Sequence, residues 1–212
     1  MEQEMKYSIP SKELSDIIWN NSIIEKYGDD STRESLVMKA VYFDTEDMVL
    51  SKNNMTVRVR VEGERKFATL KWGGCSTNGF HERNEINVPV SDESFIDPSV
   101  DMFKGSEDGE VLMQLAKDKP LINLLETRFL RRRIRLKYQQ SLVELAIDYG
   151  SIITDAGEEP ILELELELYA GNIDDLKKLG EEFAKEYGLS PENRTKFSRG
   201  VSLLKAREPK EQ

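Results

Sequence analysis

Apolar and charged residues alternate strictly between Ile161 and Tyr169, where the chain reads Ile-Leu-Glu-Leu-Glu-Leu-Glu-Leu-Tyr. Successive side chains of a β-strand point to opposite faces, so this period puts the glutamates on one face and the leucines on the other. A helix would scatter both sets around its circumference, and the alternation therefore predicts a strand. The glutamates that share a face are Glu163, Glu165 and Glu167.

The same alternation recurs in three other segments. Glu2–Ile9 places Glu2, Glu4 and Lys6 on one face, and Met55–Val61 places Arg58 and Arg60 opposite three valines. Leu124–Tyr138 predicts a long strand with Arg131, Arg133 and Arg135 on one face. Residues 36–44, 67–72, 80–90 and 142–150 are also predicted as strands, the last with Asp148 on its polar face.

Helices are expected at four places. Ser11, Asn172 and Ser190 are suitable N-caps, the last followed by Pro191 at the first helical position. Residues 91–120 hold a weaker helical pattern and are predicted to be a helical insertion between strands. Seven or eight strands with few helices predict an α+β fold that is mostly β, an antiparallel sheet closed into a barrel. We expect one domain over residues 1–205 and a charged tail over 206–212.

Composition restricts the possible functions. The chain has 33% charged and 38% hydrophobic residues and a net charge of −10, which argues against nucleic-acid or membrane binding through the overall field. The net charge does not exclude a local basic pocket. One cysteine and one histidine exclude an internal disulfide and any cysteine or multi-histidine metal cluster. The absence of a signal-like start or a long apolar run predicts a cytoplasmic protein.

The charges on the polar faces come in blocks of one sign, such as Arg58 with Arg60, or Glu163 with Glu165 and Glu167. Like charges repel, and a merely solvated surface gains nothing by collecting them. If the charged faces point inward, the strands form a charged tunnel. The apolar faces then point outward and are covered by the helices. Such a tunnel is costly unless its charges are compensated. A polyanion bridged by divalent cations compensates both signs, since arginine suits phosphate and carboxylates suit Mg²⁺ or Mn²⁺.

The ordered motifs resemble those of the CYTH superfamily, the triphosphate tunnel metalloenzymes. The chain opens with Glu-x-Glu-x-Lys at Glu2, and similar motifs follow in the family's order over nearly the whole chain. They are Tyr42-Phe43-Asp44-Thr45, Arg58-Val59-Arg60, Thr69-Leu70-Lys71, Arg83 with Glu85, Asp148-Tyr149-Gly150, the Glu-Leu-Glu-Leu run, and Lys196 with Arg199-Gly200.

The resemblance implies a barrel of about eight antiparallel strands and metal-dependent chemistry on a triphosphate. It implies metal binding by Glu2, Glu4 and one of Glu163, Glu165 and Glu167, and Asp148 joins the candidate metal ligands. The phosphate-binding residues that it implies are Lys6, Arg58, Arg60, Lys71, Arg83, Arg131, Arg133 and Lys196. Lys6, Arg58, Arg60, Lys71 and Glu85 are the expected catalytic residues.

Inorganic triphosphate is the expected substrate, because no clear set of residues for reading a base occurs in the motifs. Cyclisation of ATP to cyclic AMP, thiamine triphosphate hydrolysis with Trp19 or Trp72 as a platform, and a non-catalytic polyphosphate-binding module are the alternatives. We expect Mg²⁺ or Mn²⁺ as cofactor, a monomer or homodimer, and no nucleic-acid or membrane partner. His81 is expected at a loop edge or on the surface, Cys75 is expected to be structural, and Gly73-Gly74 is not a phosphate loop.

Overall fold

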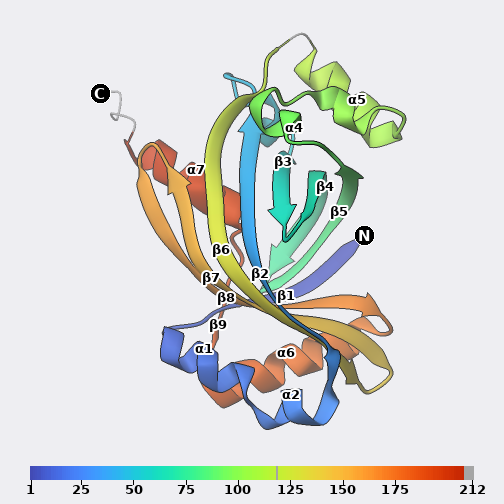
Figure 1. The fold of residues 1–212 in the computed structure, drawn as a ribbon, viewed down its shortest axis with the longest axis vertical. Helices are drawn as coiled ribbons and strands as arrows, with labels where there is room; N and C mark the ends of the chain where they lie inside the picture. The colour runs from blue at the N-terminus through green and yellow to red at the C-terminus, as the bar shows by residue number, and fades with distance from the viewer. Residues whose placement is uncertain (118, 208–212) are drawn as a thin grey trace.

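The computed structural model describes residues 1–117 and 119–207. Within them, one sheet runs in the order β5-β4-β3-β2-β6-β7-β8-β1-β9, and a further β5–β1 pairing closes eight strands into an antiparallel barrel (Figure 1). The strands are β1 (Glu2–Ser8), β2 (Gly28–Asp44), β3 (Met55–Glu62), β4 (Arg65–Thr77), β5 (Phe80–Pro89), β6 (Ile122–Tyr138), β7 (Ser141–Thr154), β8 (Gly157–Ala170) and β9 (Ser190–Pro191). The predicted closed barrel is confirmed.

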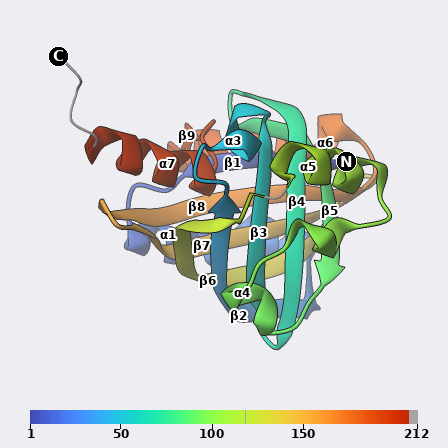
Figure 2. The ribbon, with the colours of Figure 1, turned by 90° about the horizontal axis from the view of Figure 1, so that it is seen from above.

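Helices cover the outside of the barrel, as expected from the apolar strand faces. They are α1 (Lys12–Trp19), α2 (Ser22–Tyr27), α3 (Val49–Lys52), α4 (Glu93–Ile96), the 3-10 helix η1 (Val100–Phe103), α5 (Glu107–Ala116) and α6 (Ile173–Tyr187). The last helix, α7 (Lys196–Arg207), instead brings its first residues to the inside of the barrel. Seen from above, β2, β3 and β4 cross the direction of β1, β7 and β8, so that two walls of the barrel face each other (Figure 2). No helix among the described residues is long and apolar enough to cross a membrane.

The outward faces supply the hydrophobic core. Leu164 and Leu166 of β8 are completely buried in a cluster with residues of α1, α2 and α6. Val57 and Val59 of β3 are equally buried in a second cluster beneath α3, η1 and α5. Each such side chain contributes about 1.5–3 kcal/mol on burial. The barrel is therefore stabilised from outside, which leaves its interior free to carry charge.

The close approach of α6 to β1 depends on Gly180. A Cβ at this position would lie 2.6 Å from the Tyr7 hydroxyl and 3.2 Å from the side chain of Met5. Glycine has no such atom, so α6 can pack directly on the outer face of β1. Upstream, the side chain of Asn172 accepts a hydrogen bond of 2.9 Å from the backbone N–H of Asp174, and this confirms the predicted N-cap.

Several predicted boundaries are wrong. β2 begins at Gly28 rather than Leu36, because a polar stretch without alternation pairs with β6 through an irregular register. Ser190–Pro191 does not start the last helix. It forms β9 against Tyr7 and Ser8, and α7 begins at Lys196. The predicted tail from residue 206 starts inside α7, and residues 208–212 lie outside the described residues.

The glycine-rich segment is a strand, not a loop. β4 continues to Thr77 through a bulge between Trp72 and Cys75, and the turn falls only at Asn78-Gly79. Cys75 is a free cysteine and is exposed on β4. The predicted helical insertion within residues 91–120 is confirmed by α4, η1 and α5, although residue 118 lies outside the described residues.

Candidate functional site

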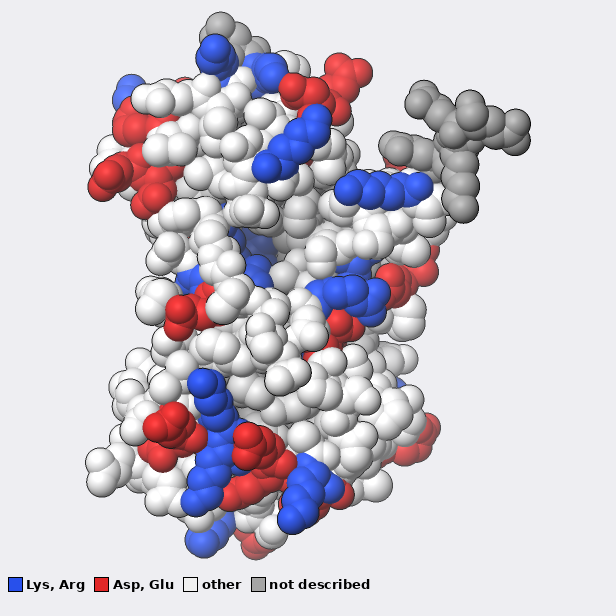
Figure 3. Space-filling model, turned by 180° about the vertical axis from the view of Figure 1, so that it is seen from behind, with Lys and Arg blue, Asp and Glu red and all other residues white. Residues whose placement is uncertain are grey.

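The polar strand faces meet inside the barrel around a cavity of about 250 Å³. From behind, the molecule is hollowed at mid-height, and lysine and arginine atoms are visible within the hollow (Figure 3). Thirteen of the fifteen predicted site residues line the cavity: Glu2, Glu4, Lys6, Arg58, Arg60, Lys71, Arg83, Glu85, Arg131, Arg133, Glu165, Glu167 and Lys196. The other two, Asp148 and Glu163, do not line it.

The acidic wall comes from β1 and β8. Their antiparallel register places Glu4 beside Glu167 and Lys6 beside Glu165. The Lys6 ammonium lies 3.1 Å from a carboxylate oxygen of Glu4 and 3.1 Å from one of Glu165. Burial opposes the charge of Lys6, but these two carboxylates outweigh burial and raise its pKa. Lys6 therefore compensates part of this wall.

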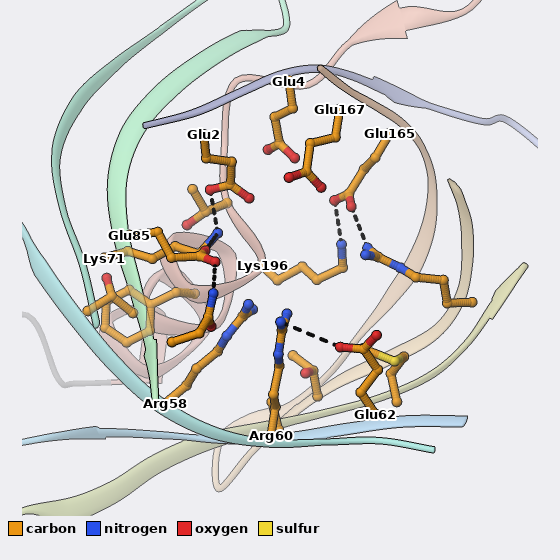
Figure 4. Close-up of a pocket in the computed structure, with 18 of the residues that line it drawn as sticks. Glu2, Glu4, Arg58, Arg60, Glu62, Lys71, Glu85, Glu165, Glu167 and Lys196 are labelled. Carbon is orange, nitrogen blue, oxygen red and sulfur yellow. Dashed lines mark hydrogen bonds and ion pairs between the residues drawn. The ribbon is translucent and has the colours of Figure 1, made fainter. Parts of the chain in front are cut away.

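Glu167 is the uncompensated member of the acidic wall. It forms no salt bridge with any residue that the structure describes, and it points into the tunnel together with Glu2 and Glu4 (Figure 4). Burial and the charges of Glu2 and Glu4 raise the pKa of Glu167 to about 8. The negative charge around Glu167 therefore outweighs the positive charge that reaches it.

The basic wall is formed by β3 and faces the acidic wall across the tunnel (Figure 4). Arg58 donates a hydrogen bond of 3.2 Å to the Tyr42 hydroxyl, yet its Nε and that of Arg60 are buried without a hydrogen-bond partner among the described residues. Burial and the neighbouring Arg58 lower the pKa of Arg60 to about 10. Arg60 stays protonated at neutral pH, and two buried donors lack an acceptor.

Lys71 links the acidic wall to β5. Its ammonium lies 2.5 Å from Glu2 and 2.6 Å from Glu85. Burial favours the neutral form of Glu85, but Lys71 and Arg58 outweigh it and lower the pKa of Glu85 to about 2. A carboxyl group with this pKa is a poor proton acceptor, so Glu85 is suited to holding Lys71 in place.

A second ionic cluster lies beyond the acidic wall, where α7 enters the barrel. The Lys196 ammonium is 2.8 Å from Asp148, 2.6 Å from Glu163 and 2.8 Å from Glu165. Arg131 also binds Asp148 through two hydrogen bonds of 2.7 Å. The three carboxylates are close enough together to hold a metal ion. However, the ammonium of Lys196 already contacts all of them.

Two tunnel carboxylates were missed from the sequence, Glu62 and Glu144. Glu62 has the same parity on β3 as Arg58 and Arg60, so the alternation pattern could have identified it. Glu144 lies opposite Glu167 in the β7–β8 register. Acids at these positions were missed because the predicted site followed blocks of like charge.

His81 lies at the start of β5, next to the turn at Asn78-Gly79, but it is completely buried, so the expected surface position is wrong. Its Nε2 lies 2.8 Å from the Glu192 carbonyl oxygen, and its Nδ1 accepts a hydrogen bond of 3.1 Å from Arg83. The Nε2 must therefore carry the proton and donate to the carbonyl. The sequence around a single histidine in a polar strand does not indicate whether its side chain is buried or exposed.

The arrangement is a charged tunnel inside a closed barrel of eight antiparallel strands, and such a barrel is what the resemblance to the CYTH superfamily implied. The model of the CYTH domain family matches residues 1–201, and the chain belongs to this family.

Individual relatives agree with this membership. The chain is 32% identical over 170 residues to an inorganic triphosphatase of Haemophilus influenzae, a match that covers 80% of this chain. It covers 47% of that protein, so the chain spans about half the length of this curated relative.

Solved structures share the fold at low sequence identity. A Hippeastrum protein, proposed as an adenylyl cyclase and found to have a dominant triphosphatase activity, superposes with a TM-score of 0.68. Its sequence identity is 17%, with 95% of this chain and 96% of that chain covered. A Bacillus halodurans protein, proposed as an adenylate cyclase, gives a TM-score of 0.59 at 19% identity over 94% and 98% of the two chains.

Proposed function

We propose that the chain hydrolyses inorganic triphosphate to phosphate and pyrophosphate inside the tunnel. The observation that carries this proposal is the pair of orphaned guanidinium donors, Arg58 Nε and Arg60 Nε, which face a wall of carboxylates. Phosphate oxygens are the acceptors that such donors suit best. The 32% identity to the inorganic triphosphatase supports the same substrate.

The small cavity favours a compact polyanion. Its volume of about 250 Å³ is below the roughly 300–1,000 Å³ typical of pockets for larger ligands. The described aromatic residues at the tunnel are also engaged with the protein itself. Tyr42 stacks on Phe197 at 5.6 Å, and Phe129 lies beneath the Lys196 ammonium at 5.2 Å. We therefore prefer inorganic triphosphate to ATP or thiamine triphosphate.

A divalent cation fits the acidic wall at Glu2, Glu4 and Glu167. Carboxylate oxygens are hard ligands that suit Mg²⁺ or Mn²⁺, and the raised pKa of Glu167 reports negative charge without a counter-ion. When bound, the cation supplies positive charge that neutralises phosphate oxygens. We assign it to these three residues because Glu167 has no salt bridge among the described residues, whereas a single ammonium, that of Lys196, contacts Asp148, Glu163 and Glu165 alike.

The chain's own residues then position the phosphates. Arg58 and Arg60 donate to the non-bridging oxygens, with Lys71 held between Glu2 and Glu85 at the side of the tunnel. Water attacks the terminal phosphorus and the bond to the bridging oxygen breaks, so that pyrophosphate leaves. Positioning and charge stabilisation supply the rate enhancement, as in phosphoryl transfer generally.

The proposal is tested by measuring phosphate, pyrophosphate and cyclic AMP released from triphosphate, ATP and thiamine triphosphate, each with Mg²⁺ and with Mn²⁺. We expect phosphate and pyrophosphate in equal amounts from triphosphate, and much slower release from the other two. Cyclic AMP from ATP would establish the cyclase alternative. Binding of triphosphate without any release would establish a polyphosphate-binding module.

A further inference from the structure

The row of arginines on β3 ends in a carboxylate. Arg58, Arg60 and Glu62 share the inner face of this strand, and Figure 4 shows Glu62 on the side of Arg60 away from Arg58. All three line the tunnel cavity. A phosphate chain that follows the arginines along β3 therefore meets a negative charge after Arg60.

Glu62 is firmly held in this position. One of its oxygens accepts hydrogen bonds of 2.9 Å from Arg133 and 2.8 Å from Arg65, and the other lies 3.5 Å from Arg60. The residue is only 7% exposed. Burial disfavours its charge, but Arg60 and Arg133 outweigh burial and lower the pKa of Glu62. Glu62 is thus a fixed anion at neutral pH.

Resting on the proposed function, we propose that Glu62 determines the number of phosphate groups that the tunnel accepts. Its carboxylate occupies a guanidinium donor of Arg133, the cavity-lining arginine that a further phosphate group would need. It also repels that group, and fixed charges a few ångströms apart inside a protein interact strongly. Triphosphate is accepted because it ends at Arg60, and tetraphosphate is disfavoured.

Glu34 provides a matched control. It binds the same guanidinium, with an oxygen 2.6 Å from Arg133 Nη2, but its side chain is 49% exposed and it does not line the cavity. If Glu62 acted only by holding Arg133, then Glu34→Gln would have the effect of Glu62→Gln. If Glu62 acts by its charge inside the tunnel, only Glu62→Gln changes the preference for chain length.

The test is calorimetric titration with inorganic triphosphate and tetraphosphate in EDTA, which prevents metal-dependent turnover. We expect the wild type to bind tetraphosphate at least tenfold more weakly than triphosphate, the difference to fall about tenfold in Glu62→Gln, and Glu34→Gln to keep the wild-type difference. Equal binding of the two ligands by the wild type overturns the proposal, and this result needs no variant to fold.

An unchanged ratio in folded Glu62→Gln, or an equal change in Glu34→Gln, also overturns it. Because binding is measured without turnover, the result does not depend on whether the chain hydrolyses triphosphate. A chain that discriminates between the two ligands but does not hydrolyse triphosphate refutes the proposed reaction and supports the role of Glu62.

Discussion

Replacing Glu167 by glutamine is expected to stabilise the metal-free protein at alkaline pH. The folded-state pKa of Glu167 is about 8, against an ordinary value of 4.5. The folded chain therefore holds a proton that the unfolded chain loses above pH 4.5. The stability that this proton gives is present in acid and is lost as the pH rises through 8. Glutamine never ionises and avoids this loss.

The size of the effect follows from the pKa. A pKa raised from 4.5 to about 8 corresponds to roughly 5 kcal/mol, at 1.36 kcal/mol per pH unit. Glu167 is only half-buried, and partial contact with water reduces this to about 2 kcal/mol. For a chain of this length, that corresponds to a rise in Tm of about 4–8 °C at pH 9. At pH 5 the two proteins should differ by less than about 1 kcal/mol.

The assay is thermal unfolding in EDTA from pH 5 to pH 9, followed by circular dichroism. Glu165→Gln is the matched control, because Glu165 lies on the same strand but is paired with Lys6, Lys196 and Arg131. Its replacement should lower Tm at both pH values. Equal Tm values for wild type and Glu167→Gln at pH 9, or the same difference at pH 5, would refute the reasoning about an uncompensated acidic wall.

Three further predictions concern the same tunnel. Mg²⁺ or Mn²⁺ should raise the Tm of the wild type and should raise the Tm of Glu167→Gln much less, because a ligand stabilises the folded state that binds it. Equal rises in Tm would show that Glu167 is not a metal ligand. Glu4→Gln should fold, as judged by circular dichroism, but its kcat/KM for triphosphate should fall at least about a hundredfold. Turnover near that of the wild type would count against Glu4 as a metal ligand. Lys196→Met should lower the free energy of unfolding, measured by urea denaturation, by about 3–5 kcal/mol, because three buried carboxylates lose their shared cation. An unchanged free energy of unfolding would contradict this pairing.

The barrel and its charged interior could be predicted from the alternation of residues, since a period of two fixes which side chains share a face. Arg131 and Arg133 line the tunnel as predicted. Arg132, of opposite parity, lies outside, 2.8 Å from Asp16. Ser190 shows the limit of local patterns. It has the form of an N-cap, but pairing with β1 overrides that preference.

Which of the β8 glutamates form salt bridges, and which does not, could not be predicted in the same way. Glu163, Glu165 and Glu167 are equivalent in the sequence, and parity treats them alike. What separates them is contact with distant residues: Lys196 from α7 reaches Glu163 and Glu165 but forms no salt bridge with Glu167 among the described residues. Such pairings depend on how α7 enters the barrel, which a strand pattern does not encode.

The central claim is that ionic faces from separate strands converge on one triphosphate-binding tunnel. Its most direct test is the rise in Tm that triphosphate produces in the wild type, Arg60→Ala and Arg132→Ala. Arg60→Ala should weaken binding by about 1.5–3 kcal/mol, the value of charge-assisted hydrogen bonds, and lose most of the rise. Arg132→Ala should keep it, because its pair with Asp16 lies outside the tunnel. Equal losses in both variants, or no loss in Arg60→Ala, would contradict the tunnel.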